Sequence, residues 1–170
     1  MVEMIKHVAS CSFGKDSNAQ VIVGHENDEQ IDELVYSEVM FDKDISGELP
    51  EHRDFIYNVA IPKFESLGYK VTVLRARETY VDRFFKEKKL GKRAGQIYGF
   101  PPVMKCWVNS EIKMKPIREY WKQQPEGVVQ YVGIAVDEPE RLDRIINTKN
   151  KISLLKKYPR HGRHVSGGLC

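Results

Sequence analysis

Residues 5–17 read IKHVASCSFGKDS, and this stretch sets the kind of fold to expect. Residues 5–11 are short, apolar and partly β-branched, which is typical of a buried strand. Residues 18–25 carry an apolar side and favour a helix. Between them, the hexapeptide at 12–17 contains Gly14, which lets the backbone turn tightly and approach a ligand. The stretch therefore predicts a strand, a tight turn and a helix.

This turn, called the 12–17 loop below, has the features of a phosphate site. The N–H groups at the start of the following helix attract an anion, and Lys15 adds a positive charge. Ser12 and Ser17 add hydroxyl donors. It is not a Walker A loop, because Ala9 and Asp16 stand where that motif needs glycine and serine or threonine. The alternative is an ordinary strand–helix turn with an aspartate cap.

Strand-like runs alternate with helical patterns along the rest of the chain. We expect further strands at 34–41, 70–75 and 128–136, the last at the centre of the sheet. We expect further helices at 50–67, 79–89, 106–112, 116–122 and 139–146. Pro62 should kink the helix that Pro50 opens, and Val81, Phe84 and Phe85 should face inward.

This alternation indicates an α/β fold with a mostly parallel, twisted sheet and helices on both faces, a Rossmann-like arrangement. We expect a single domain over residues 1–158 and an irregular tail over 159–170. In such sheets the ligand lies beyond the carboxyl ends of the strands. Residues 12–17, 42–51, 75–79 and 137–141 should therefore surround one crevice.

The composition narrows the functional classes. Apolar residues make up 41% and charged residues 30%, so the chain is neither disordered nor fibrous. No apolar run approaches the ~20 residues of a membrane span, and no secretory signal is seen, so we expect a cytoplasmic protein without a membrane partner. Cys11, Cys106 and Cys170 are an odd, scattered set. They argue against a disulfide framework and against a four-cysteine zinc or iron–sulfur site.

The charges are unevenly distributed. Residues 24–54 contain eleven acidic and two basic side chains, a net charge of −9. Residues 86–115 contain eight basic and two acidic side chains, a net charge of +6. One basic segment in a near-neutral chain suits a small anion better than a nucleic acid, which we do not expect as a partner. The alternative is a solvated surface loop.

The 12–17 loop resembles the modified P-loop S-G-G-K-D-S of the adenine-nucleotide α-hydrolase superfamily, with Phe13 in place of the first glycine. Other segments resemble the branch of 3′-phosphoadenosine 5′-phosphosulfate (PAPS) reductases. The first comprises VMFD at 39–42 and ELPE at 48–51. The second comprises Cys106 and KMKPI at 113–117. The third comprises YVGI at 131–134 with Asp137, Glu138 and Arg141. The chain departs from that branch at Ala135, where many members carry arginine, and at Lys43-Asp44, which replaces Thr-Gly. It also lacks the E-C-G-L-H segment that carries the nucleophilic cysteine, and ends in GGLC at 167–170.

The resemblance implies a role for each matching segment. The phosphate or sulfate of the nucleotide would bind Ser12, Phe13, Gly14, Lys15, Asp16 and Ser17. Val39, Met40 and Asp42 would flank the adenine, although Asp42 also fits a turn cap. Further nucleotide contacts would come from Lys113, Gly133, Ile134, Asp137, Glu138 and Arg141. Lys15, Asp16 and Cys170 are the candidate catalytic residues.

Two further features bear on the ligand. Lys92 and Arg93 lie in a glycine-rich basic segment that fits a cationic flap, mobile without ligand and closing on a phosphate. Asp137 and Glu138 are paired carboxylates that suit Mg²⁺ if the substrate is ATP. No residue set points to a definite metal site.

Three functions follow. The first is a PAPS reductase-like enzyme of sulfur metabolism, an oxidoreductase acting on PAPS or adenosine phosphosulfate with a thiol donor such as thioredoxin. The second is an ATP pyrophosphatase, which would adenylate an acceptor and release pyrophosphate with Mg²⁺. The third is a non-catalytic nucleotide-binding module that works with a partner protein. We expect an adenine nucleotide as ligand in all three cases, and no iron–sulfur cluster.

Overall fold

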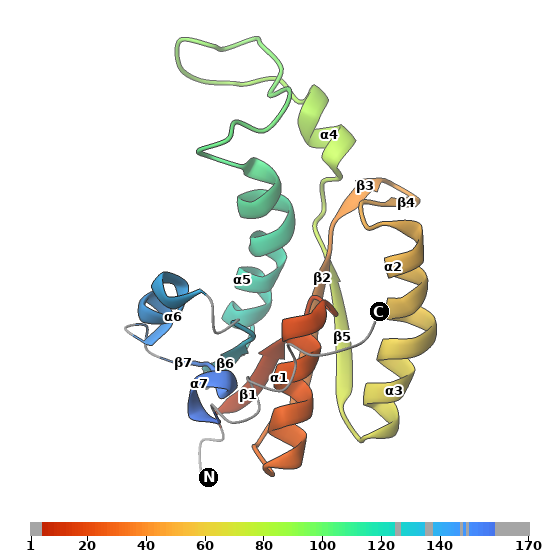
Figure 1. Ribbon diagram of the computed structural model, residues 1–170. Helices are drawn as coiled ribbons and strands as arrows, with labels where there is room; N and C mark the ends of the chain where they lie inside the picture. The colour runs from red at the N-terminus through yellow and green to blue at the C-terminus, as the bar shows by residue number, and fades with distance from the viewer. Residues whose placement is uncertain (1–4, 125–126, 135–137, 147, 149, 159–170) are drawn as a thin grey trace. The chain divides into compact units, whose positions relative to one another are not determined.

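The computed structural model describes residues 5–124, 127–134, 138–146, 148 and 150–158 (Figure 1). The chain forms two compact units whose segments alternate along the sequence. The first unit comprises Met1–Tyr36, Ala60–Thr72 and Gln124–Cys170. The second comprises Ser37–Val59 and Val73–Gln123. Each unit is described by itself below.

A five-stranded sheet runs in the order β5-β2-β1-β6-β7. Its strands are β1 (Lys6–Ser10), β2 (Glu33–Glu38), β5 (Lys70–Arg75), β6 (Val128–Val132) and β7 (Lys151–Ile152). The pairs β1–β2, β1–β6 and β6–β7 are all parallel. Together with the flanking helices, this sheet confirms the expected α/β class with a Rossmann-like arrangement.

The middle of the sheet is β1, whose Val8 and Ala9 are fully buried. The expectation that the strand near 128–136 would be central is wrong, because β6 lies one place away and its residues Val128–Gln130 are only partly buried. The last residue expected in that strand, Val136, lies outside the described residues.

The helices of the first unit include α1 (Lys15–Glu26), α3 (Ile61–Ser66), α6 (Pro139–Ile146) and α7 (Leu154–Lys157). Helix α1 begins at Lys15, three residues earlier than the apolar pattern indicated, with Gly14 as its N-cap. At its far end Gly24 allows close packing, because a Cβ there would lie 2.6 Å from the Ile31 side chain and 3.0 Å from Leu154.

The second unit begins at Ser37, and the expected strand 34–41 is interrupted within it at Val39. A two-stranded antiparallel sheet follows, formed by β3 (Met40–Asp42) and β4 (Ile45–Ser46). Pro50 opens α2 (Pro50–Phe55), as expected. The kink expected at Pro62 takes the form of a π-helical turn, Ile56–Ala60, directly before α3.

Helix α4 (Tyr80–Phe85) is shorter than the predicted 79–89 and starts with a capping box between Thr79 and Asp82. Phe85 does not face inward as expected, because 64% of its surface is exposed. A π-helical turn (Val108–Lys113) continues directly into α5 (Met114–Lys122), where two separate helices were expected.

Among the described residues, none of the helices combines the length and the hydropathy that a membrane crossing requires.

Candidate functional site

The 12–17 loop joins the carboxyl end of β1 to the start of α1. Strand β1 pairs with β2 on one side and β6 on the other, so the direction of chain progression reverses between β1 and β6. In parallel sheets, ligands bind beyond the carboxyl ends of the strands at such a reversal. The loop therefore lies where the topology favours a binding site.

The loop is held by the side chains of Ser17 and of Asn18, the residue that follows it. Asn18 Nδ2 donates to the carbonyl oxygen of Phe13 at 2.9 Å, and Ser17 Oγ donates to that of Gly14 at 3.0 Å. The N–H of Cys11 donates to the carbonyl oxygen of Val35 at 3.0 Å, which fixes the residue just before the loop to β2. The carbonyl oxygens of Phe13 and Gly14 thus already accept hydrogen bonds within the fold.

The backbone N–H groups at the start of α1 are left open. Within the described part of the chain, the N–H groups of Lys15 and Asp16 have no acceptor, and the first helical bond runs from Asn18 to Gly14. The positive end of the helix dipole lies at this point. Such an N-terminus attracts phosphate or sulfate.

Phe13 stands where similar loops carry a glycine, and its surroundings show how the fold accommodates it. Its φ of +58° is left-handed, a conformation that favours glycine. The side chain is buried, with its ring 5.3 Å from Tyr36 and 6.2 Å from Phe64. Burying a phenylalanine contributes about 1.5–3 kcal/mol, which offsets a backbone strain of about 1–3 kcal/mol. Phe13 can therefore meet a ligand only through its backbone.

The polar side chains of the loop differ in exposure. Lys15 is exposed and forms no ion pair with any residue the structure describes. Ser12 is exposed and its Oγ lies 3.3 Å from Oγ of the buried Ser17. An ammonium group and a hydroxyl are thus available beside the open N–H groups.

The end of β6 lies against the same loop. A Cβ on Gly133 would lie 2.7 Å from the carbonyl oxygen of Asp16 and 3.1 Å from Cα of Ser17. Gly133 therefore lets the backbone after β6 touch the first turn of α1, with Ile134 buried next to it. The structure places Gly133 directly against the 12–17 loop.

Helix α6 begins just beyond that point. Arg141 Nη1 and Glu138 Oε2 form an ion pair at 2.9 Å, so this carboxylate already has a cation. Asp137 and Ala135 lie outside the described residues. The described residues hold no group of three histidine, cysteine or acidic side chains placed for a metal ion.

The other predicted site residues belong to the second unit. Met40 is buried and Val39 partly buried, while Lys92, Arg93 and Lys113 are exposed. Asp42 Oδ1 accepts a hydrogen bond from the N–H of Lys43 at 2.8 Å, the geometry of a turn cap. That these residues share a crevice with the 12–17 loop remains a prediction.

The predicted flap contains a short hairpin with a bridge between Glu87 and Ile97, and residues 86–105 are called the basic hairpin below. Its backbone bonds include Tyr98 N–H to the oxygen of Lys86 and Lys88 N–H to that of Gln96, both at 2.9 Å. The guanidinium of Arg83 lies 4.3 Å from the centre of the Tyr98 ring at its base. Its mobility without ligand remains a prediction.

Sequence reasoning missed a buried carboxylate at the end of β2. Glu38 accepts hydrogen bonds from Tyr57 Oη at 2.7 Å, from Ser46 Oγ and Arg75 Nε at 2.8 Å, and from Arg53 Nε at 3.3 Å. Burial raises the pKa of Glu38, but these hydrogen bonds outweigh it and hold the pKa below its ordinary value. The signal in the sequence that could have indicated this site was a glutamate at the end of a largely apolar strand.

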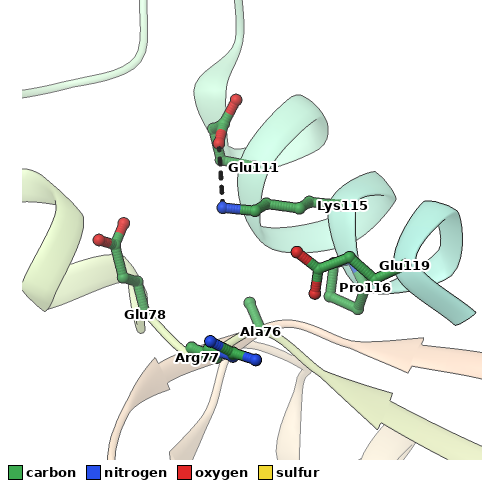
Figure 2. A pocket seen from close by; sticks show the side chains of 7 residues that line it. All are labelled: Ala76, Arg77, Glu78, Glu111, Lys115, Pro116 and Glu119. Atoms are coloured by element: carbon green, nitrogen blue, oxygen red, sulfur yellow. Dashed lines mark ion pairs between the residues drawn. The ribbon is translucent and has the colours of Figure 1, made fainter.

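The second unit also contains a cavity of about 130 Å³ beyond the carboxyl end of β5 (Figure 2). It is lined by Ala76, Arg77, Glu78, Glu111, Lys115, Pro116 and Glu119. Lys115 Nζ lies 4.0 Å from Glu111 Oε2, whereas Arg77 and Glu119 have no ion-pair partner among the described residues. The cavity is highly charged, and it adjoins the predicted 75–79 segment.

Cys11 is the thiol next to the loop, and it is buried with Sγ 3.7 Å from Asn18 Oδ1. Burial raises the pKa of its thiol, which disfavours the reactive thiolate. Cys106 is exposed in the second unit, and Cys170 lies outside the described residues. Cys11 is therefore a packing residue.

No family model, curated protein or solved structure matches this chain. The functional assignment therefore rests on the geometry of the 12–17 loop and on the order of the sequence motifs.

Proposed function

We propose that the chain binds an adenine nucleotide, with the phosphate or sulfate group held by the 12–17 loop. The supporting observation is the open start of α1 beside an unpaired Lys15, at the reversal point between β1 and β6. The resemblance to PAPS reductase-like proteins favours a sulfonucleotide, PAPS or adenosine phosphosulfate, as the ligand.

The anion would receive hydrogen bonds from the N–H groups of Lys15 and Asp16 and from the hydroxyl of Ser12. The Lys15 ammonium would add a charge-assisted bond, worth about 1.5–3 kcal/mol. Gly133 supports this arrangement, because its missing side chain lets the backbone directly after β6 come close to the carbonyl of Asp16. The helix start thereby presents its N–H groups in a fixed direction.

Nucleotide binding is favoured over a particular reaction, because the buried Cys11 does not supply a thiolate at the loop. Reduction of a sulfonucleotide would need a thiol from elsewhere, with Cys170 as the candidate in this chain. Adenylation with pyrophosphate release would need no thiol, and its magnesium would be held largely by the nucleotide phosphates.

Thermal unfolding with PAPS, adenosine phosphosulfate, ATP and AMP, each with and without Mg²⁺, tests the proposal. A ligand at 100 times its dissociation constant should stabilise the chain by about 2.7 kcal/mol. We expect the sulfonucleotides to raise the melting temperature most. No shift with any of the four nucleotides would contradict the proposal.

Lys15→Ala locates the site. We expect the dissociation constant for the stabilising nucleotide to rise by about tenfold to a hundredfold, from loss of a bond of about 1.5–3 kcal/mol. Lys63→Ala is the matched control, since Lys63 is an exposed lysine of the first unit, on α3. Equal affinities of the two variants, measured by titration calorimetry, would place the site elsewhere.

A further inference from the structure

A row of aromatic side chains runs along the second unit. The Phe41 ring on β3 stacks on Tyr80 at 5.4 Å, and Tyr80 lies 6.1 Å from Phe84. Phe84 in turn lies 4.9 Å from Phe85 and 5.0 Å from Phe100. These five residues are called the aromatic strip. Figure 1 shows α4 between the β3–β4 sheet and the basic hairpin.

Much of this strip is open to solvent. Phe41 is 45% exposed, Phe85 64% and Phe100 80%. Further apolar side chains of the same unit are more than half exposed: Ile45 in β4, Leu49 just before α2, and Leu90, Val103 and Met104 in the basic hairpin. Proteins that act alone rarely expose so many neighbouring apolar groups, and aromatic side chains are enriched in protein interfaces.

The two ends of the strip carry opposite charge. Residues 41–51, the acidic end, contain four acidic side chains and one basic one, a net charge of −3. The basic hairpin, residues 86–105, contains six basic side chains and one acidic one, a net charge of +5. Asp44, Glu51, Lys89, Lys92 and Arg93 are exposed and form no ion pair with other described residues.

The opposite charges at the two ends of the strip indicate which kind of partner fits it. A nucleic acid or an anionic membrane would be attracted by the basic hairpin but repelled by the acidic end. The matching surface is one that offers a basic end, an apolar middle and an acidic end in the reverse order. The chain itself offers that surface.

We propose that the aromatic strip pairs with the strip of a second copy of this chain in an antiparallel, two-fold arrangement. The acidic end of each protomer then faces the basic hairpin of the other, and the aromatic rings meet in the middle. A two-fold interface requires a self-complementary surface, and this charge order meets that requirement. The inference uses only second-unit residues and does not depend on the proposed nucleotide site.

The molar mass of the full chain in solution is the first test. Light scattering and sedimentation should give twice the chain mass of 19.7 kDa at about 0.1 M salt. At about 1 M salt the charge attraction is screened beyond about 3 Å, and the dimer should weaken. A mass of 19.7 kDa at every protein concentration tested at low salt would overturn the proposal.

Charge reversal gives the sharper test. Variant one carries Lys89→Glu, Lys92→Glu and Arg93→Glu, and variant two carries Asp44→Lys and Glu51→Lys. Each alone should dimerise more than about a hundredfold more weakly, because like charges then face each other. Mixed together, they should form a one-to-one heterodimer, because every contact is again between opposite charges.

The control is Lys63→Glu, a charge reversal on α3 in the first unit, which should leave the dimer unchanged. Variants that remain dimeric alone, or that fail to associate when mixed while each is folded by circular dichroism, would overturn the arrangement. So would association that appears only after adding an oligonucleotide or vesicles of anionic lipid.

Discussion

At the scale of single residues, Gly133 controls the position of the loop. Gly133→Ala places a methyl group against the backbone of Asp16, which cannot move without shifting the start of α1. We expect the free energy of unfolding to fall by about 1–3 kcal/mol, as for overpacking. Nucleotide affinity should fall as well, because the open N–H groups lose their direction.

Gly24→Ala is the matched control for this variant. It creates a comparable clash at the other end of α1, against the side chains of Ile31 and Leu154. Urea unfolding should show a loss of stability in both variants, while titration with nucleotide should show a loss of affinity in Gly133→Ala alone. Unchanged affinity in Gly133→Ala would separate this glycine from the ligand site.

At the scale of elements, the Glu38 cluster joins β2, α2 and β5 through one carboxylate, which binds Arg53 of α2 and Arg75 of β5. Because the pKa of Glu38 is lowered by folding, the folded chain holds fewer protons than the unfolded chain in mild acid. The stability from this group is fully present above the ordinary pKa of 4.5 and is lost as the pH falls toward the folded value.

Glu38→Gln should therefore lower the free energy of unfolding at pH 7 by about 1–3 kcal/mol, because the hydrogen bonds from Arg75 and Tyr57 lose their charged acceptor. It should also flatten the decline of stability in acid. Urea midpoints between pH 3 and pH 7 measure both effects. Glu51→Gln, on the exposed start of α2, should keep the wild-type decline. The same acid slope in wild type and Glu38→Gln would rule out this role.

The elements also show what the sequence could predict. Strand β5 and helix α6 occupy the expected residues, because each is a local pattern bounded by turn signals or proline. Gly133 was a candidate nucleotide contact only through the resemblance, and its contact with the 12–17 loop comes from the structure. The Glu38 cluster was missed because its partner Arg75 is 37 residues away, and no local period encodes such a contact.

The exposure of Phe85 was missed for a related reason. Helical spacing predicts that it shares a side with Val81, but only the length of α4 decides whether that side is covered. The helix ends at Phe85, so its ring lies at the edge. An apolar side chain at an element's end can serve a partner as well as the core.

At the scale of the whole molecule, the question is which reaction follows binding. We expect this chain alone to bind nucleotide but release little or no sulfite from PAPS with thioredoxin, because burial raises the pKa of the thiol beside the loop. Sulfite release by the wild type and by Cys170→Ser measures this. Robust release that Cys170→Ser abolishes would show that the chain supplies its own thiolate. Pyrophosphate release from ATP would favour the adenylating alternative.

The pairing of β1 with β6 has a consequence for biosynthesis. Ser10 lies opposite Val132, so the strand that precedes the phosphate loop waits for a neighbour made more than a hundred residues later. A ribosome delivers β1 early, and one edge of that strand stays uncovered until β6 emerges. The loop thus gains its support at Gly133 late in translation. Between the synthesis of β1 and that of β6, the nascent chain presents an unpaired strand edge of the kind that can pair with another chain.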